Sequence, residues 1–457
     1  MTFGTALTGL NAATSDLNAT AHNISNTATV GFKYSRAEFA DLFATTMGGS
    51  LTSTGMGVRT ARIAPQFSPG PLTQTENALD LAIDGQGFFV VKDGKGSTYY
   101  TRAGQFQPDG QGYVETAEGQ RLQVYAAEPV AASPIRQALG GITGQLGQVA
   151  GLQVQGPQKD YTINTGKLQD LKIDESVLDP KATTNVDVSV NLSANDKPPS
   201  ASRFKPDNPE SYNYATSTTV YDSLGVEHTM TTYFIKDRAG TWTARIYVDG
   251  NSAGRTRLNF DRQGKPGNLT STAISFNIPK NGTLSLPVVG TISAPRFVPN
   301  IATQGNGAGP MTFTVNFGDS TQYDMDYAVN SVTQDGYTMG AYAGLSIDTD
   351  GTVYSLYTNG EQKAMGQVAL AKFINAQGLM PQGDTLWQEY LKSGQAVYGQ
   401  AGTSGFGVIR SKTLEGSNVD LSAQLVRLII AQRNFQGNVQ SITAEDNNIQ
   451  TILQVGR

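Results

Sequence analysis

Residues that could bind a metal ion stand close together at 348–351 in this chain of 457 residues. Asp348, Asp350 and Gly351 have the spacing with which a calcium-binding loop begins. Such a loop needs a glutamate at its twelfth position, because two carboxylate oxygens complete the shell around the ion. That position is Asn359 here. The stretch is therefore interpreted as a hairpin turn, and we predict neither a metal nor a cofactor.

Other residues with the chemistry of catalysis occur singly. Asp80 and Asp84 could form a carboxylate pair for acid and base catalysis, but no second glycosidase motif accompanies them. His22 and His228 are the two histidines, and neither has the serine or aspartate motif of a hydrolytic triad. The glycine-rich stretch 402–407 lacks the lysine of a phosphate-binding loop. The sequence therefore predicts no catalytic residue and a protein that is not an enzyme.

Composition favours many short strands and weakly charged surfaces. Charged residues are 16% of the total, the net charge is −5, and there are 51 glycines. Polar surfaces of this kind can pack against copies of themselves. Basic residues form no cluster that would attract nucleic acid or an anionic membrane, so neither is expected as a partner. The absence of cysteine excludes disulfides, thiol chemistry and a four-cysteine zinc site.

Signals for membrane insertion or classical secretion are not recognisable. The first charged residue is Asp16 and the first cation is Lys33, whereas a cleaved signal peptide begins with a basic segment. No apolar run approaches the roughly 18 residues of a membrane span, and Arg427 interrupts the best candidate. We therefore expect no membrane insertion, and either a soluble chain or export by a route that reads no cleaved signal.

Both ends of the chain carry apolar residues at alternating spacings of four and three, the pattern of a coiled-coil seam. We call these residues the heptad seam: Phe3, Leu7, Leu10, Leu17 and Ile24 near the N-terminus, and Leu421, Leu425, Leu428, Phe435, Val439, Ile442, Ile449 and Leu453 near the C-terminus. We expect few large apolar residues off the seam. The seams alone bury too little to offset the entropy of ordering two helices, so we expect them to pair with each other and with copies of the chain. The alternative is a pair of ordinary core-facing helices in a globular domain.

The sequence between these ends alternates as antiparallel strands do, so the predicted fold class is α+β. Terminal helical coiled-coil segments join nested β-domains, with the central lobe as an insertion. The predicted divisions are 1–28 and 418–457 for the helical domain, 29–75 and 395–417 for irregular connecting segments, 76–145 and 328–394 for an inner β-domain, and 146–327 for an outer β-lobe of one or two subdomains. The irregular assignment depends on glycines and prolines such as Gly57, Pro65 and Pro71.

Each predicted helix carries a further signal. Small residues of the first helix should leave room for close approach of a second helix; they are Ala6, Ala12, Ala13, Ala19 and Ala21. Ser417, with Asp420 three positions later, has the form of a capping box that would start the last helix.

Three separated stretches resemble the rod and hook family of bacterial flagellar axial proteins. They are residues 9–13 with 22–26 and 31–33, residues 81–89 with 100–104 and Phe106, and residues 417–421 with 431–436. Within this family, residues 221–225 followed by His228 and Thr229 are similar to the hook members, and rod members lack so large a central insertion. The resemblance covers the outer parts of the chain and this one part of the central lobe.

The resemblance implies a structural subunit that polymerises into the bent tube of the bacterial flagellar hook, the flexible joint that transmits motor torque to the filament. It also implies export by the flagellar type III apparatus without a cleaved signal, and an extracellular location. The implied partners are the chain itself, the hook cap protein, the distal rod, the hook–filament junction proteins and the export apparatus. Phe39 and Phe43 resemble an element that the export gate reads; alternatively, they anchor their segment in a core.

Two other functions remain open on the sequence. A distal-rod or hook–filament junction protein would share the terminal motifs. A secreted β-rich adhesin or carbohydrate-active enzyme would use the helical ends to form trimers.

Overall fold

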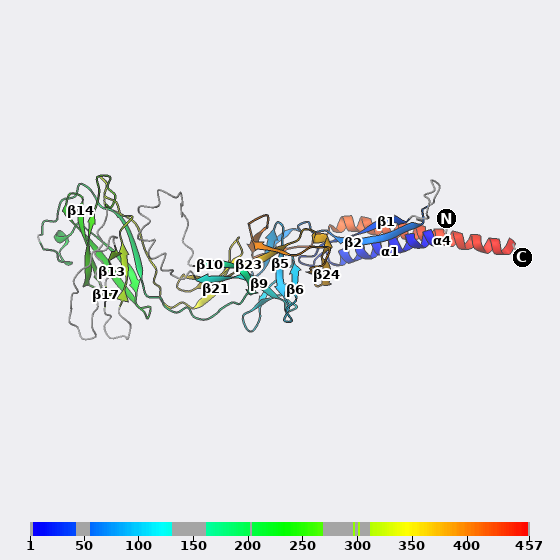
Figure 1. Cartoon of the computed structure of the whole chain (residues 1–457), viewed down its shortest axis with the longest axis horizontal. Coiled ribbons are helices and arrows are strands. Elements are labelled where there is room, and N and C mark those ends of the chain that lie inside the picture. Colours follow the sequence, from blue (N-terminus) through cyan, green and yellow to red (C-terminus); the bar gives the residue numbers. More distant parts are fainter. Residues whose placement is uncertain are drawn as a thin grey trace.

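The computed structural model describes residues 3–42, 55–129, 161–201, 203–267, 296–297, 300–301 and 311–455. The chain is elongated, with two helices at one end, a β-lobe at the other and a large β-sheet between them (Figure 1). The predicted combination of a mostly β chain with one N-terminal and one C-terminal helix is confirmed. Neither helix in the described ranges is long and apolar enough to cross a lipid bilayer.

The helices α1 (Phe3–Ser25) and α4 (Leu421–Val455) lie side by side and antiparallel (Figure 1). Asn23, near the end of α1, donates a hydrogen bond of 3.2 Å to the Oε1 of Gln424 at the start of α4. Towards the other end, a Cβ added at Gly9 would strike the side-chain amide of Asn438. At about 1.5 Å per residue, α4 is about 52 Å long and α1 about 34 Å, so α4 extends beyond the start of α1.

A β-hairpin occupies part of the segment 29–75 that we expected to be irregular. Strand β1 (Ser35–Leu42) pairs antiparallel with β2 (Gly57–Pro65), and both contact α1. The expectation was wrong because Gly57 begins β2 and Pro65 ends it, and residues at strand ends do not interrupt the hydrogen-bonded ladder. We call α1, α4, β1 and β2 the stem.

The predicted irregular segment 395–417 also forms strands. Strand β26 (Val397–Gln400) joins β23 (Gln362–Lys372), β27 (Val408–Ser411) pairs with β4 (Leu81–Asp84), and β28 (Thr413–Glu415) pairs with β3 (Leu72–Gln74). Gly402 and Gly405 lie in the turn between β26 and β27, and Gly399 lies within β26. The chain therefore returns to the first helix along strands that pair with sequence more than three hundred positions earlier.

The inner β-domain is built around a twelve-stranded sheet. Its main path is β21 (Tyr342–Ile347), β22 (Thr352–Tyr357), β23, β9 (Arg121–Pro129), β5 (Phe88–Lys92), β6 (Thr98–Thr101), β25 (Leu386–Gln388) and β24 (Met380–Gly383), with β7 (Gln107–Pro108), β8 (Val114–Glu115), β10 (Tyr161–Asp170) and β26 joined to it. All its pairings are antiparallel in the described part. Because β10 pairs with β9, residues 161–170 belong to this sheet and not to the outer lobe, where we had placed them. Strand alternation does not encode the partner of a strand, which tertiary contacts decide.

The outer lobe contains two four-stranded sheets that share one hydrophobic core. Within the described residues one sheet is β12 (Tyr214–Tyr221), β13 (Glu227–Arg238), β14 (Thr241–Val248) and β15 (Asn251–Asn259), and the other is β16 (Arg296–Phe297), β19 (Thr314–Asn316), β11 (Asn185–Asn191) and β20 (Ala328–Gln334). The strands β17 (Asn300–Ile301) and β18 (Met311–Thr312) form a separate two-stranded sheet, and Met311 belongs to the same core. The core brings Val188 of β11 together with Phe234 and Trp242 of the other sheet. Two sheets with one core form a single packing unit.

Candidate self-assembly surface

The heptad seam remains on the surface of the chain. Phe3, Leu7, Leu421, Leu425, Val439, Ile449 and Leu453 are exposed, and Leu10, Leu17, Ile24, Leu428, Phe435 and Ile442 are half-buried. Full burial of such a side chain contributes about 1.5–3 kcal/mol, and these residues forgo much of it in the single chain. A neighbouring surface could recover that free energy.

Small residues, and not the heptad seam, make the contacts of α1 within the chain. Its buried residues are Ala6, Ala12, Ala13, Ala19, Thr20 and Asn23, and α4 buries Ala431 and Gln424. Four of the five alanines that we expected to allow close approach are therefore buried, while Ala21 is exposed. The expectation that α1 and α4 bury their seams against each other is wrong, because small side chains let the backbones approach and turn the larger ones outward.

Exposed apolar residues also occur off the seam, contrary to our expectation. Val426, Ile429 and Ile430 are 57%, 50% and 51% exposed. At about 100° per residue, Val426 and Ile429 lie roughly 140–160° around the helix from the buried Gln424. Ile430 lies about 120° from Gln424, and these three residues form a surface that we call the α4 apolar patch. The patch faces away from α1, so α1 cannot cover it.

The two phenylalanines considered for export cannot both be placed. Phe39 lies on β1 and is 43% exposed, so it does not anchor this segment in a core. Phe43 lies outside the described residues. Recognition of either residue by an export gate stays a prediction.

The start of α4 is capped by Asp420 and not by Ser417. The Oδ1 of Asp420 accepts a hydrogen bond of 3.1 Å from the amide of Ala423, and its carbonyl accepts the first helical bond from Gln424 at 2.9 Å. The hydroxyl of Ser417 accepts from Val419, before the helix begins, at 3.3 Å. The capping box expected from Ser417 and Asp420 is therefore not formed; Asp420 is a simple N-cap, and Ala423 has no side chain that could reach back to it.

Replacing Asp420 with alanine is expected to destabilise the stem by about 1 kcal/mol, because an amide of the first turn loses its acceptor. Hydrogen exchange of the amides of residues 421–425 and the urea unfolding midpoint measure the loss. Ser417→Ala is the control and should have the smaller effect on those amides. The reverse order would contradict the assignment of the cap.

A buried cluster of charges joins the stem to the inner β-domain. Lys33, Arg102 and Glu415, which we call the anchor cluster, have side chains 0%, 3% and 0% exposed. The Nζ of Lys33 lies 2.6 Å from the Oε1 of Glu415, and the Nη1 of Arg102 lies 3.2 Å from its Oε2. The carboxylate of Glu415 is therefore paired with two cations in a site that is almost fully buried.

Backbone groups complete the anchor cluster. Lys33 also donates to the carbonyl of Ser68 at 2.7 Å, and the amide of Gly70 donates to the Oε1 of Glu415 at 2.9 Å. Arg102 donates to the carbonyls of Ile83 and Gly85 at 3.2 and 2.7 Å. The Nε of Arg102 is buried and has no hydrogen-bond partner among the described residues. Removing one member would therefore leave several aligned donors or acceptors without a partner.

Burial and charge act in opposite directions on the two cations. Burial lowers the pKa of Lys33, and the carboxylate of Glu415 opposes this effect. Burial likewise lowers the pKa of Arg102, again opposed by Glu415. Desolvation of a charged group costs several kcal/mol unless a paired charge offsets it, so the cluster depends on its single anion.

The anchor cluster contains Lys33 and Arg102, which lie in two of the family-like stretches and which we did not assign to a site. Lys33 follows Gly31, whose φ of +70° and contact with the backbone of Ala103 leave no room for a side chain. Arg102 belongs to residues 100–104 and is held in place by the hydrogen bonds that it donates to carbonyls within 81–89. Sequence reasoning missed the cluster; the only available signal was that these are isolated charges within weakly charged segments.

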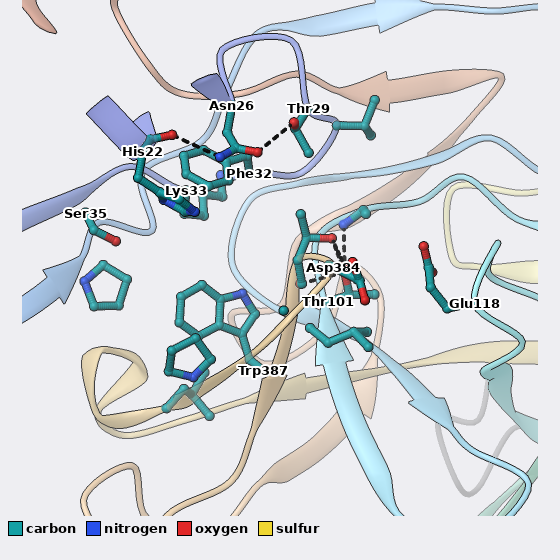
Figure 2. Close-up of a pocket in the computed structure, with 18 of the residues that line it drawn as sticks. His22, Asn26, Thr29, Phe32, Lys33, Ser35, Thr101, Glu118, Asp384 and Trp387 are labelled. Atoms are coloured by element: carbon teal, nitrogen blue, oxygen red, sulfur yellow. Dashed lines mark hydrogen bonds between the residues drawn. The ribbon is translucent and has the colours of Figure 1, made fainter. Parts of the chain in front are cut away.

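A groove of about 720 Å³ lies between the stem and the inner β-domain beside the anchor cluster (Figure 2). His22, Asn26 and Phe32 line it from the stem, while Trp387 and Asp384 line it from the opposite side. The ring of His22 lies 5.4 Å from that of Phe32. Asn26 donates to the carbonyl of His22 at 2.9 Å and accepts from the hydroxyl of Thr29 at 3.1 Å. Hydrogen bonds within residues 22–29 therefore stabilise this wall of the groove.

The other residues considered for chemistry lie far apart or have structural partners. Asp84 pairs with Arg410 at 2.7 Å on the surface, and Asp80 accepts from Asn77 at 3.1 Å. His228 lies in the outer lobe and His22 in the groove. Residues 348–351 form the turn between β21 and β22. Within the described residues, no group of three or more histidine, aspartate or glutamate side chains could hold a metal ion.

Three family models match successive parts of the chain. Residues 82–190 match the flagellar hook protein FlgE/F/G D1 domain, 191–337 match the flagellar basal body protein FlaE D2 domain, and 410–455 match the flagellar basal body rod FlgEFG protein C-terminal region. These models cover most of the outer lobe, much of the inner β-domain and the helix α4.

Individual proteins match over greater lengths. The chain is 35% identical over 458 residues to the flagellar hook protein FlgE of Escherichia coli (strain K12), and 34% identical over 457 residues to that of Salmonella typhimurium, in each case covering 100% of both chains. The crystal structure of Helicobacter pylori flagellar hook protein FlgE2 is 16% identical, covers 75% of this chain and 100% of that one, and has a TM-score of 0.49. Because the first two matches extend over the whole of both chains, this chain belongs to the family of flagellar hook proteins FlgE.

Proposed function

We propose that this chain is the structural subunit that polymerises into the bacterial flagellar hook, the extracellular joint between motor and filament. The full-length likeness to hook proteins supports this role. The observation that carries it is the exposure of large apolar side chains along both terminal helices of the single chain. Contacts between different surfaces of identical copies produce a helical polymer when they do not close into a ring.

We further propose how the subunit is arranged in the tube. The terminal helices of neighbouring copies pair as coiled coils through the heptad seam and line the inner channel, while the nested β-domains form the outer wall. The elongated chain, with its helices at one end and its outer lobe at the other, supports this orientation (Figure 1). The α4 apolar patch supports contact with more than one neighbouring helix, since it faces away from the seam-bearing partner within the chain.

The family likeness supports further partners. We propose export by the flagellar type III apparatus, with Phe39 and Phe43 read by the export gate, and contacts with the hook cap, the distal rod and the hook–filament junction proteins. Substitution of Phe39 and Phe43 by serine, followed by measurement of hook protein outside the cell, tests the export element. Unchanged secretion would contradict it.

Polymerisation of the purified chain tests the main proposal. We expect the full chain to form curved tubes at high protein and salt concentration in electron micrographs, because salt screens the net charge and favours burial of the exposed apolar residues. A variant lacking residues 1–28 and 419–457 should remain monomeric. Straight, rigid tubes would favour a distal-rod or junction protein instead, and tubes formed by the shortened variant would contradict assembly through the helices.

A further inference from the structure

The outer lobe is connected to the inner β-domain by two segments of chain, residues 171–184 and 335–341, which we call the neck (Figure 1). Two β-bridges join these segments. Leu178 and Gly340 exchange backbone hydrogen bonds of 2.8 and 3.1 Å, and Lys181 and Tyr337 exchange two of 3.0 Å. An isolated pair of strands is marginally stable and twists readily, so the neck by itself would not hold the lobe at one angle.

The neck has open space on one side. A hollow of about 480 Å³ is lined by neck residues, among them Val177, Pro180 and Tyr337, together with Tyr357 and Lys363 of the inner sheet. Val177 is 52% exposed. Because side chains of the inner sheet do not fill this hollow, they leave the neck room to bend towards it.

The turn 221–225 of the outer lobe packs against the neck. The amide of Tyr221 donates to the hydroxyl of Thr183 at 2.8 Å, and the amide of Thr183 donates to the carbonyl of Tyr221 at 3.0 Å. A Cβ added at Gly225 would lie 2.8 Å from the Cβ of Pro180 and 3.1 Å from the Cα of Thr338. These distances are shorter than the roughly 3.5–4.0 Å of a favourable carbon contact. The turn therefore touches both segments of the neck at the closest approach that glycine allows.

The turn itself is held rigidly. Asp222 is fully buried, and its Oδ1 accepts hydrogen bonds from the amides of Leu224 and Val226 at 2.9 and 2.8 Å. The ring of His228 lies between the two loops at this end of the lobe, with Nδ1 2.6 Å from the Oδ2 of Asp249 and Nε2 3.6 Å from the Oδ2 of Asp222. A turn whose amides are hydrogen-bonded to a buried carboxylate keeps its shape when it is pressed against the neck.

We propose that the turn 221–225 is a stop that sets the angle between the outer lobe and the inner β-domain, with Gly225 as its point of contact on the neck. Rotation of the outer lobe towards the neck ends when Gly225 contacts Pro180 and Thr338, and the hydrogen bonds between Tyr221 and Thr183 stabilise the lobe at that angle. The angle is a property of the single chain, and only its consequence for the curvature of a hook rests on the proposed function.

Two glycines of the outer lobe provide a matched pair of substitutions. Gly225 and Gly250 both lie in turns between adjacent strands, with φ of +77° and +76°, so alanine introduces the same backbone strain at either position. They differ in surroundings, because nothing lies within 4 Å of a Cβ added at Gly250. Gly225→Ala therefore tests the contact with the neck, and Gly250→Ala controls for the strain.

Distances between spin labels in the full chain measure the angle. Because the sequence contains no cysteine, Lys95→Cys on the inner domain and Arg255→Cys on the outer lobe place two labels without side reactions. We expect Gly225→Ala to displace the distance distribution, and Gly250→Ala to leave it as in the parent. A distribution for Gly225→Ala that coincides with the parent would overturn the proposal.

A second variant covers the case in which Gly225→Ala does not fold. Thr183→Val removes the hydroxyl that accepts from the amide of Tyr221 and donates to the Oε1 of Gln334 at 3.2 Å, while keeping the shape of a buried side chain. It should broaden the distance distribution, because the lobe loses a bond that holds it against the neck. An unchanged width would count against the stop. Since these measurements use the free chain, they are independent of whether the polymer proves to be a hook.

Discussion

Replacing Ile429 and Ile430 with glutamate should raise the concentration needed for polymerisation by about a thousandfold. Each half-exposed isoleucine gains about 1 kcal/mol when a neighbouring copy buries it, and burying an unpaired glutamate in its place costs at least about 1 kcal/mol more; a total loss of about 4 kcal/mol corresponds to three powers of ten in the association constant. Glutamate is a good helix former, so α4 should persist. Sedimentation of polymer over a range of protein concentrations measures the change.

The free chain should be nearly unaffected by this substitution, because both side chains are about half exposed before assembly. The urea midpoint of the unpolymerised protein checks that expectation. Ile429→Val with Ile430→Val is the control: it keeps most of the apolar area, so tubes should form within about a tenfold range of the parent concentration. Polymerisation of the glutamate variant at the parent concentration would show that the α4 apolar patch is not an assembly surface.

Replacing Glu415 with glutamine should lower the free energy of unfolding by about 3–5 kcal/mol, the cost typical of breaking a buried ion pair. The amide would meet the ammonium of Lys33 and the guanidinium of Arg102, both donors, and would leave two buried cations without an anion. Urea unfolding followed by circular dichroism measures the loss.

The surface pair between Asp84 and Arg410 offers a matched control, since it is also a carboxylate paired with arginine. Its side chains are 45% and 54% exposed, and Asp84→Asn should cost about 0.2–1 kcal/mol. Lys33→Met should fall between the two, because Glu415 keeps Arg102 as its partner. Equal effects of Glu415→Gln and Asp84→Asn would mean that the anchor cluster does not stabilise the chain.

The loss in Glu415→Gln should also depend on pH. Burial lowers the pKa of Lys33, and removing the carboxylate that opposes burial should lower this pKa further. The unfolded chain, in which a lysine titrates near about 10.4, then binds more protons than the folded chain between the two pKa values, so stability rises with pH across that window. The difference in free energy of unfolding between the parent and Glu415→Gln should therefore shrink from neutral pH towards about pH 10. A difference in free energy of unfolding that grows over this range would contradict the expected lowering of the pKa of Lys33.

Periodic patterns in the sequence predicted which segments form helices and strands better than they predicted which residues contact one another. The apolar spacing correctly predicted a helix at each end, and the alternation expected of strands between the ends is present in β11, where Val186, Val188 and Val190 are buried. The same spacing misled us about packing, because large side chains at heptad positions mark a surface to be covered and do not say by which chain. The small residues Ala6 and Ala13 carry a weaker pattern, yet they are the ones buried.

The anchor cluster could not be predicted because its members stand at positions 33, 102 and 415 and meet through pairings that the sequence does not reveal. Glu415 reaches the cluster through β28, within a segment whose glycines suggested irregular structure. The hairpin of β1 and β2 was missed for a similar reason, since Gly57 and Pro65 mark its ends. Breaker residues locate boundaries, and only the residues between them show whether a strand lies there.

The closure of the stem also bears on when the chain can fold. Asn23 and Gln424 share a hydrogen bond although 401 positions separate them. During synthesis α1 can pack against β1 and β2 early, but its helical partner α4 is absent until almost the last residues emerge. Contacts of such long range form late, since the intervening chain must first come to order. The pair of helices in the stem therefore stays open until the molecule is complete, and the arrival of α4 allows α1 to dock on it.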